Sequence, residues 1–187
     1  MNNDVAEVLA ELDAHRARFE AFCRSLSEEQ LARPVPRSTW AVKDFISHLA
    51  TIDEPITEMF RFSHTGVRGN SAPLADVDTW NETQVQERRT WSVDRIFAGA
   101  TEQRAELRAA LSELTAEDIA KPMKFGGDSK RGSSEFPLAL FIRGWNKHDP
   151  MHAMDMVRAL PEVVTPELEA WFDDPAIANY QAAMNQG

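Results

Sequence analysis

The segment VAEVLAELDAHRARFEAFCRSL, residues 5–26, decides the fold class because its apolar residues recur at steps of three and four. That spacing places them on one face of an α-helix, opposite a face rich in charged residues. A face of this kind is stable when it is buried against other elements. The segment therefore predicts a long amphipathic helix in a helical core, with a buried stripe of Val5, Val8, Leu9, Leu12, Phe19, Phe22, Cys23 and Leu26.

A second helix with the same period is expected to begin near Ser38 or Thr39. Pro55 should kink or interrupt it, because proline cannot donate the backbone hydrogen bond that a helix interior needs. Residues 63–76 contain glycine, asparagine and proline without apolar periodicity, and they predict a long surface connection. The buried face of this second helix is expected to comprise Phe45, His48, Leu49, Ile52, Ile56 and Met59.

Three further helices are expected along the rest of the chain. Residues 77–90 predict a polar helix, and an amphipathic stripe resumes after Ser92. A last long helix follows the glycine-rich segment KFGGDSKRGSS, residues 124–134. Pro150 should kink this helix or mark a new start capped by Asp149. Its stripe consists of Leu138, Phe141, Trp145, His148, His152, Met156 and Ala159.

Two short stretches of the chain are similar to one another. LSEEQLARP (residues 26–34) and LTAEDIAKP (residues 114–122) match in register, and each follows a long helical stripe. The first has a serine three residues before a glutamine, which is a capping-box pattern. The repetition favours two related halves, each with a long helix, a capped turn, a connection and a second long helix, although nine positions could also converge on good turn chemistry. With either explanation the fold is predicted to be all-α.

The length and composition predict one domain over residues 1–187. A chain of 187 residues with 43% hydrophobic residues can bury one well-packed core. The 30 acidic and 20 basic residues give a net charge of -10, and the basic residues are dispersed. Duplex DNA and anionic membranes both require clustered lysine and arginine, so neither is expected as the main partner. A small molecule or another protein is expected instead.

The cysteine content and the N-terminal residues indicate a protein of a reducing cytoplasm. Cys23 is the single cysteine, so the chain cannot form an internal disulfide. The first residues, MNNDVAEVLAELD, are acidic where a signal peptide would be basic and then apolar. No apolar run approaches the roughly 20 residues that span a bilayer. We expect a cytoplasmic protein in which Cys23, on the apolar face of its helix, is a buried hydrophobe rather than a reactive thiol.

Three of the five histidines, His48, His148 and His152, fall on faces that are predicted to be buried, whereas His15 lies at the edge of a stripe and His64 at the start of a loop. Buried imidazoles without acidic partners leave nitrogens in need of hydrogen bonds, and protonating more than one would bring like charges together. A divalent cation would satisfy all three rings. Two histidines at i and i+4 share one side of a helix, and a third from a facing helix would leave open coordination positions. The spacing alone leaves two interpretations, a metal site and imidazoles packed in a core.

Three stretches of the sequence resemble the DinB/YfiT-like superfamily. They are STWAVKDFISHLATIDEP (residues 38–55), VDTWNETQVQERRTW (residues 77–91) and NKHDPMHAMDM (residues 146–156). The resemblance runs from the first helix to about Leu160, and the single histidine and the histidine pair are its specific part. This grouping includes bacillithiol and mycothiol S-transferases and mycothiol-dependent maleylpyruvate isomerases.

The resemblance implies an antiparallel four-helix bundle over about residues 1–160, and a homodimer. It implies that His48, His148 and His152 bind a divalent metal ion such as zinc, nickel or iron. A low-molecular-weight thiol such as mycothiol or bacillithiol would then be activated for transfer or isomerisation. A metal-dependent hydrolase and a non-catalytic, stress-linked bundle remain alternatives, because an ion held by three neutral imidazoles can activate a thiol or a water molecule alike.

Other side chains near the histidines in sequence could complete such a site. Arg143 and Lys147 could hold carboxylates of a thiol or an acidic substrate, although surface bases need no such role. The acidic candidates for orienting the imidazoles are Asp53, Glu54, Asp149 and Asp155. The candidates for an aromatic pocket are Trp40, Trp80, Phe141 and Trp145, and Asn81 could face the site beside Trp80.

The last residues, 161–187, are expected to extend the bundle. This segment belongs less clearly to the family pattern than the helices before it. Its large apolar residues predict an additional helix that packs on the bundle or forms a dimer contact. They are Trp171, Phe172, Ile177 and Tyr180.

Overall fold

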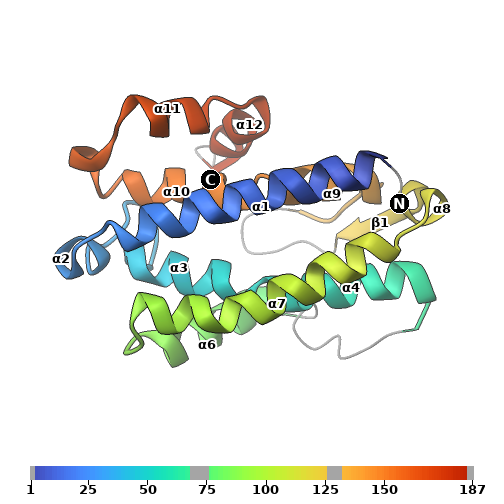
Figure 1. Cartoon of the computed structure of the whole chain (residues 1–187), viewed down its shortest axis with the longest axis horizontal. Helices are drawn as coiled ribbons and strands as arrows, with labels where there is room; N and C mark the ends of the chain where they lie inside the picture. The colour runs from blue at the N-terminus through green and yellow to red at the C-terminus, as the bar shows by residue number, and fades with distance from the viewer. Residues whose placement is uncertain (1–2, 68–75, 126–131, 185–187) are drawn as a thin grey trace.

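The computed structural model describes residues 3–67, 76–125 and 132–184 (Figure 1). Within these ranges the regular structure is almost entirely helical, which confirms the predicted all-α class. The bundle is built from two unbroken long helices and two that are each broken into a pair. They are α1 (Asn3–Arg24), α3 (Val42–Thr51) with α4 (Asp53–Thr65), α7 (Val93–Glu113), and α9 (Leu138–Trp145) with α10 (His148–Val157).

The packing of these helices brings distant parts of the sequence together. Helix α7 packs against α1, α3 and α4, and α10 packs against α1 and α3. The predicted polar helix is α6 (Val77–Arg88), which packs on α3. Helix α4 extends to Thr65, so it includes the start of the predicted surface connection. Residues 68–75 of that connection lie outside the described residues.

Both broken helices are interrupted near a proline. Helix α3 ends before Ile52, three residues ahead of Pro55, and the predicted interruption is confirmed. In the other pair, α10 makes a new start two residues before Pro150. The predicted capping role of Asp149 is wrong: Lys147 occupies the N-cap position without a side-chain hydrogen bond. The Asp149 carboxylate is turned into the core instead, where it binds Arg16.

The two repeated stretches form the capped turns that the sequence predicts. Ser27 accepts a hydrogen bond from the backbone of Gln30, and the Gln30 side chain bonds back to Ser27. Thr115 and Asp118 make the same reciprocal pair in the second half. Each box opens a short helix. These helices are α2 (Glu28–Leu31) and α8 (Ala116–Ala120).

Each capped turn is followed by an antiparallel extended pair, which the sequence analysis missed. In the first half a single bridge joins Pro34 to Ala41. This extended backbone delays the start of α3 to Val42, later than the predicted Ser38 or Thr39. In the second half β1 (Pro122–Phe125) pairs with β2 (Ser134–Pro137), and residues 126–131 of the glycine-rich segment lie outside the described residues. The order of elements is therefore the same in both halves.

Two arginines and two aspartates form buried ion pairs inside the bundle. Arg16 donates from Nε and Nη2 to the two carboxylate oxygens of Asp149, each at 2.9 Å. Arg104 Nε lies 2.6 Å from Asp53 Oδ2, and all four residues are at most 8% exposed. Arg104 follows Arg16 by 88 residues, the same spacing that separates the repeated stretches. Each pair joins the long helix of one half to the broken helix of the other, which supports the interpretation of two related halves.

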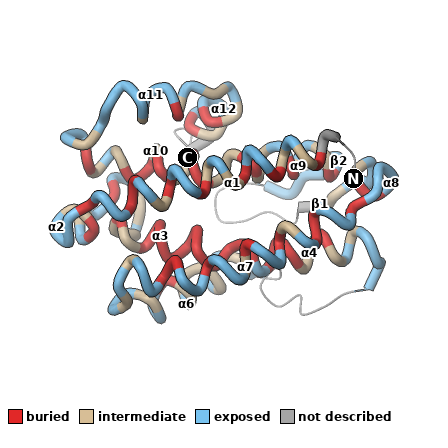
Figure 2. The backbone as a smooth tube through the Cα atoms, viewed as in Figure 1, coloured by how far each residue is buried: buried red, intermediate tan, exposed pale blue. Residues whose placement is uncertain are grey.

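The apolar core follows the inner faces of the helices, where the buried residues lie (Figure 2). The predicted stripe of α1 is confirmed except at Val8, which is only partly buried. Cys23 is fully buried, and this burial raises the pKa of its thiol well above the ordinary value. Cys23 is therefore the inert core residue that its position on the apolar face predicts.

The C-terminal extension folds back on the bundle as two α-helices rather than one. After η1 (Pro161–Val163) come α11 (Pro166–Phe172) and α12 (Pro175–Met184), and both pack on α10 (Figure 1). Trp171 and Ile177 are buried, and Trp171 Nε1 donates to His15 Nδ1 at 2.8 Å. The predicted packing role of this segment is confirmed, and homodimerisation stays a prediction.

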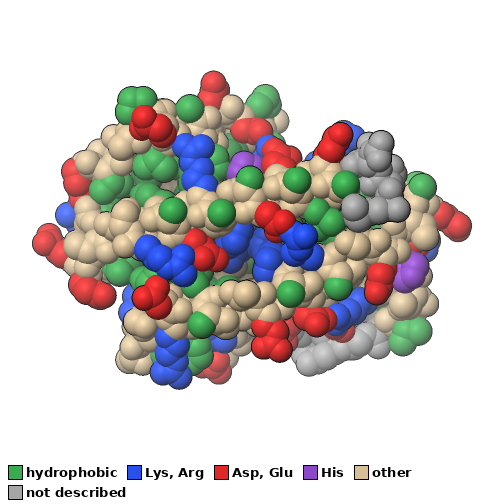
Figure 3. All heavy atoms as spheres, in the orientation of Figure 1, with side chains coloured by type: hydrophobic (Ala, Val, Ile, Leu, Met, Phe, Trp, Pro, Cys, Tyr) green, Lys and Arg blue, Asp and Glu red, His purple; other side chains and the backbone are tan. Residues whose placement is uncertain are grey.

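Charges of both signs alternate over the described part of the face shown in Figure 3. Exposed ion pairs join α1 to α7, Arg24 with Asp94 and Asp13 with Arg108. Among residues 3–67, 76–125 and 132–184, no helix combines the length and the apolar character needed to cross a membrane.

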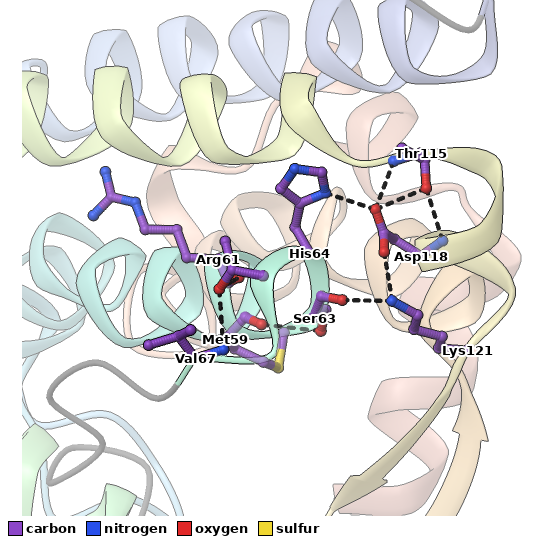
Figure 4. A network of polar contacts seen from close by, with 9 residues as sticks. Met59, Arg61, Ser63, His64, Val67, Thr115, Asp118 and Lys121 are labelled. Atoms are coloured by element: carbon purple, nitrogen blue, oxygen red, sulfur yellow. Dashed lines mark hydrogen bonds and ion pairs between the residues drawn. The ribbon is translucent and has the colours of Figure 1, made fainter.

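His64 lies in the last turn of α4 and binds Asp118 of α8 (Figure 4). Its Nδ1 atom is 2.8 Å from Asp118 Oδ2, and Lys121 Nζ is 2.6 Å from Oδ1. The same carboxylate accepts from the backbone N–H of Thr115 at 2.9 Å. These hydrogen bonds, that of His64 foremost, hold the pKa of the Asp118 carboxyl well below its usual range. The imidazole of His64 thus has a structural role.

Asp118→Asn is expected to lower the free energy of unfolding at pH 7 by about 1–2 kcal/mol, because the amide cannot accept from both His64 and Lys121 as the carboxylate does. A carboxylate with a lowered pKa stabilises the fold above the pKa of the unfolded chain, near 3.8, and this stabilisation is lost as the pH falls toward the folded value. Urea unfolding at a series of pH values should give a constant difference in the free energy of unfolding between the wild type and the variant down to about pH 5. Below about pH 4 this difference should become smaller. A difference that stays constant to pH 3 would contradict the stabilising role of the ionised Asp118 carboxylate. The control is Glu117→Gln, a change at an exposed residue of the same helix.

Candidate metal centre

Three histidines from two helices meet in one cluster. His48 comes from α3, and His148 and His152 come from successive turns of α10. One potential ligand atom from each ring lies within 4.8 Å of the other two. The Nε2 atoms of His148 and His152 are 3.1 Å apart. The trio that the sequence singles out is therefore brought together, while His15 and His64 lie elsewhere in hydrogen bonds to Trp171 and Asp118.

The local sequence explains this convergence. The spacing of four residues puts His148 and His152 on one side of α10, and the new helix start at His148 directs that side toward α3. His48 lies on the buried face of α3, three residues after Phe45, and is only 5% exposed. The ring of His48 meets those of His148 and His152 at centroid distances of 5.4 and 5.1 Å.

Hydrogen bonds to the outer nitrogens orient two of the rings. His48 Nδ1 lies 3.2 Å from the carbonyl oxygen of the Asn81 side chain, and His152 Nδ1 lies 3.0 Å from Asp155 Oδ2. Both partners are acceptors, so each Nδ1 carries the proton and each Nε2 presents a lone pair. This is the arrangement that proteins use to present imidazole to a metal ion.

Aromatic side chains enclose the cluster. The ring of Trp145 stacks on His148 with centroids 4.2 Å apart, and Trp40 lies 5.3 Å from His48. Phe45, which the sequence analysis treated only as a core residue, lies 5.4 Å from His152. These rings cover the imidazoles with apolar surface and lower the local dielectric constant.

The other two predicted aromatic residues, Phe141 and Trp80, lie behind the rings that contact the histidines. Phe141 stacks on Trp145 at 5.8 Å, and Trp80 packs against the core around α3. The predicted proximity of Asn81 to the site is confirmed by its contact with His48.

The electrostatic surroundings favour a neutral His148 and an ionised Asp155. Burial, together with the nearby His152 and His48, lowers the pKa of His148 well below 6.5. Burial alone would raise the pKa of Asp155, but its hydrogen bonds with His152, Gln181 and Tyr180 outweigh that effect, and the net pKa is lowered. At neutral pH, His148 is therefore neutral, as a metal ligand must be.

The geometry fits a transition-metal ion. Two nitrogens that each lie about 2.0–2.1 Å from one tetrahedral ion are about 3.3–3.4 Å apart, close to the 3.1 Å between the Nε2 atoms of His148 and His152. His48 supplies a third nitrogen within 4.8 Å of the other two. Within the described residues the cluster comprises these three imidazoles, a donor set that matches a site with open positions.

Of the acidic residues that the sequence suggested as partners of the histidines, Asp155 takes this role. Asp149 binds Arg16, and Asp53 pairs with Arg104, because these buried guanidinium groups require counter-charges. Glu54 is exposed. The sequence could not distinguish these carboxylates, since each lies close to a histidine along the chain.

The two basic residues suggested for substrate binding have other surroundings. Lys147 forms ion pairs with Glu11 and with Asp174 of the C-terminal extension, the latter at 3.1 Å. Arg143 is exposed on α9. The sequence analysis also missed Gln181, whose amide binds Asp155, because a single glutamine near a chain end carries no recognisable pattern.

Comparisons with known proteins agree with this architecture. A family model described as the DinB superfamily matches residues 11–156. No curated protein gives a match. Two solved structures are similar to this chain with a TM-score of 0.62: the mycothiol-dependent maleylpyruvate isomerase at 12% identity and a mutant of that enzyme at 11%.

The structural similarity covers 81% of this chain and 60% of the isomerase chain, so this chain spans less than two thirds of that protein. At this level of identity the similarity shows a shared fold. The family match extends over most of the 187 residues and includes His48, His148 and His152. The resemblance seen in the sequence is confirmed, and the chain belongs to the DinB superfamily.

Proposed function

We propose that this protein binds one divalent transition-metal ion through His48, His148 and His152 and uses it to activate a low-molecular-weight thiol for transfer or isomerisation. The convergence of the three imidazoles, with ligand atoms within 4.8 Å of one another, is the observation that carries this proposal. The acceptors on the outer nitrogens of His48 and His152 add to it. Zinc, nickel and iron all suit three imidazole ligands.

The residues around the cluster have defined tasks in this proposal. Asn81 and Asp155 keep the Nδ1 atoms protonated, so the Nε2 atoms face inward. Trp40 and Trp145 limit the access of water to the rings. When bound, a divalent ion held by neutral imidazoles would keep its full charge and lower the pKa of a thiol at an open position.

The choice of a thiol rests on the comparisons. The similar solved structures are described as a mycothiol-dependent enzyme, and no similar observation supports hydrolysis. Because this chain spans 60% of the isomerase chain, we carry over the use of a thiol and not the isomerase's electrophilic substrate. Mycothiol and bacillithiol are the thiols to test first.

Turnover that requires both metal and thiol is the expected result when metal-loaded protein is incubated with mycothiol or bacillithiol and a set of small electrophiles. Loss of electrophile can be followed by absorbance or mass spectrometry. The matched controls are protein treated with a chelator and the His48→Ala variant, both of which should be inactive. Consumption without added thiol would favour a hydrolase. A metal-loaded protein that consumes no electrophile under any condition would contradict the enzymatic role.

A further inference from the structure

The carboxylate of Asp155 lies in contact with four side chains. Oδ2 receives hydrogen bonds from His152 Nδ1 and from the Tyr180 hydroxyl, both at 3.0 Å. Oδ1 receives one from Gln181 Nε2 at 3.2 Å and forms an ion pair with Arg158, also at 3.2 Å. Two of the four partners, Tyr180 and Gln181, come from α12. This helix lies beyond residue 156, where the family match ends.

Helix α12 is held in place by its own packing on the bundle. Ile177 is fully buried, and α12 packs directly on α10. Trp171 of α11 is buried against His15 of α1, and Asp174 pairs with Lys147 at the start of α10. The two donors of α12 are therefore presented to Asp155 from a fixed direction.

Asp155 also forms an ion pair with Arg158, through the carboxylate oxygen that His152 does not use. Arg158 lies three residues further along α10, and its side chain is 31% exposed. An aspartate that followed this arginine toward solvent would release His152, and its Nδ1 proton would lose its acceptor. Tyr180 binds the same oxygen as His152, and its ring meets the His152 ring edge-on at 5.9 Å. Gln181, which is buried, donates to the other carboxylate oxygen, Oδ1.

We propose that α12 is a positioning element of the metal site, in which Tyr180 and Gln181 hold Asp155 so that His152 presents Nε2 to the metal. This inference rests on the proposed metal site. Tyr180 and Gln181 act through Asp155 and are positioning residues. A group that binds a ligand directly, as Asp155 binds His152, typically contributes 10–100-fold to metal affinity, and Tyr180 and Gln181 act through this group.

Zinc affinity measured by competition with a chromophoric chelator tests the role of α12. Tyr180→Phe keeps the ring and removes the hydroxyl, and it is expected to weaken zinc binding roughly 10-fold. Tyr180→Phe combined with Gln181→Leu should weaken it further, toward roughly 100-fold. Asn179→Ala, an exposed change on the same helix, is the matched control and should bind zinc as the wild type does.

Repeating Tyr180→Phe in an Asp155→Ala background distinguishes the positioning role of α12 from a purely structural one. If Tyr180 acts through Asp155, the substitution has no further effect on zinc affinity once the carboxylate is gone. Equal losses in both backgrounds would overturn the inference, as would wild-type affinity in the Tyr180→Phe, Gln181→Leu variant. Thermal unfolding of each metal-free variant shows whether the protein is folded. A wild-type chain that binds no metal would instead overturn the proposed function, and this inference with it.

Discussion

His48→Ala is expected to remove the bound metal from a protein that remains folded. Elemental analysis of the wild type should give about one transition-metal ion per chain, and the variant should retain almost none. Loss of one of three ligands should weaken binding by more than the 10–100-fold that follows loss of an outer-shell partner. His148→Ala and His152→Ala are expected to have the same effect, because all three nitrogens lie within 4.8 Å of one another.

The other two histidines provide matched controls for this experiment. His15 accepts from Trp171, and His64 binds Asp118, both outside the cluster. His15→Ala and His64→Ala should therefore keep the full metal content, although each can lower stability. Circular dichroism and thermal unfolding distinguish loss of metal from loss of fold. Full metal content in any one of the three cluster variants would remove that histidine from the ligand set.

The helices and the histidine cluster could be predicted because both depend on short-range periodicity. The stripe of α1 and the spacing of His148 and His152 are each visible within a few turns of sequence. The convergence with His48 required one more inference, that the two helices pack against each other. Both histidine-bearing faces were predicted to be buried, and this supported the inference. The helix breaks near Pro55 and Pro150 were also predictable, since proline acts locally.

The contacts that could not be predicted join residues far apart in the chain. Arg16 and Asp149 are separated by 133 residues, and no sequence motif links the two positions. Asp149 was predicted to cap a helix because it precedes Pro150, and its true partner is set by tertiary packing. One signal was present: Arg16 and Arg104 occupy equivalent positions relative to the repeated stretches. A basic residue repeated at the same point of two apolar stripes indicates that each is buried beside an acidic partner.

Arg16→Met is expected to lower the free energy of unfolding by about 3–5 kcal/mol, the second large effect that the structure predicts. Burial alone would raise the pKa of Asp149, but Arg16 and Arg104 outweigh this effect and keep it below the usual range. The carboxylate is thus ionised at neutral pH. Without Arg16, the remaining ion-pair partner of the 3% exposed Asp149 carboxylate among the described residues is Arg104, whose Nη2 is 3.7 Å away and which already pairs with Asp53. Urea unfolding at pH 7 measures the loss.

The double variant Arg16→Met, Asp149→Leu should be more stable than Arg16→Met alone, because it removes both members of one pair and leaves Arg104 with Asp53. The destabilisation of the single variant arises mainly from the unpaired charge, which the second substitution eliminates. Arg24→Met, which breaks the ion pairs of a 45% exposed arginine with Glu20 and Asp94, is the control and should change stability by at most about 1 kcal/mol for each pair. A double variant no more stable than Arg16→Met would show that the packing of these side chains, rather than their charge, holds the two halves together.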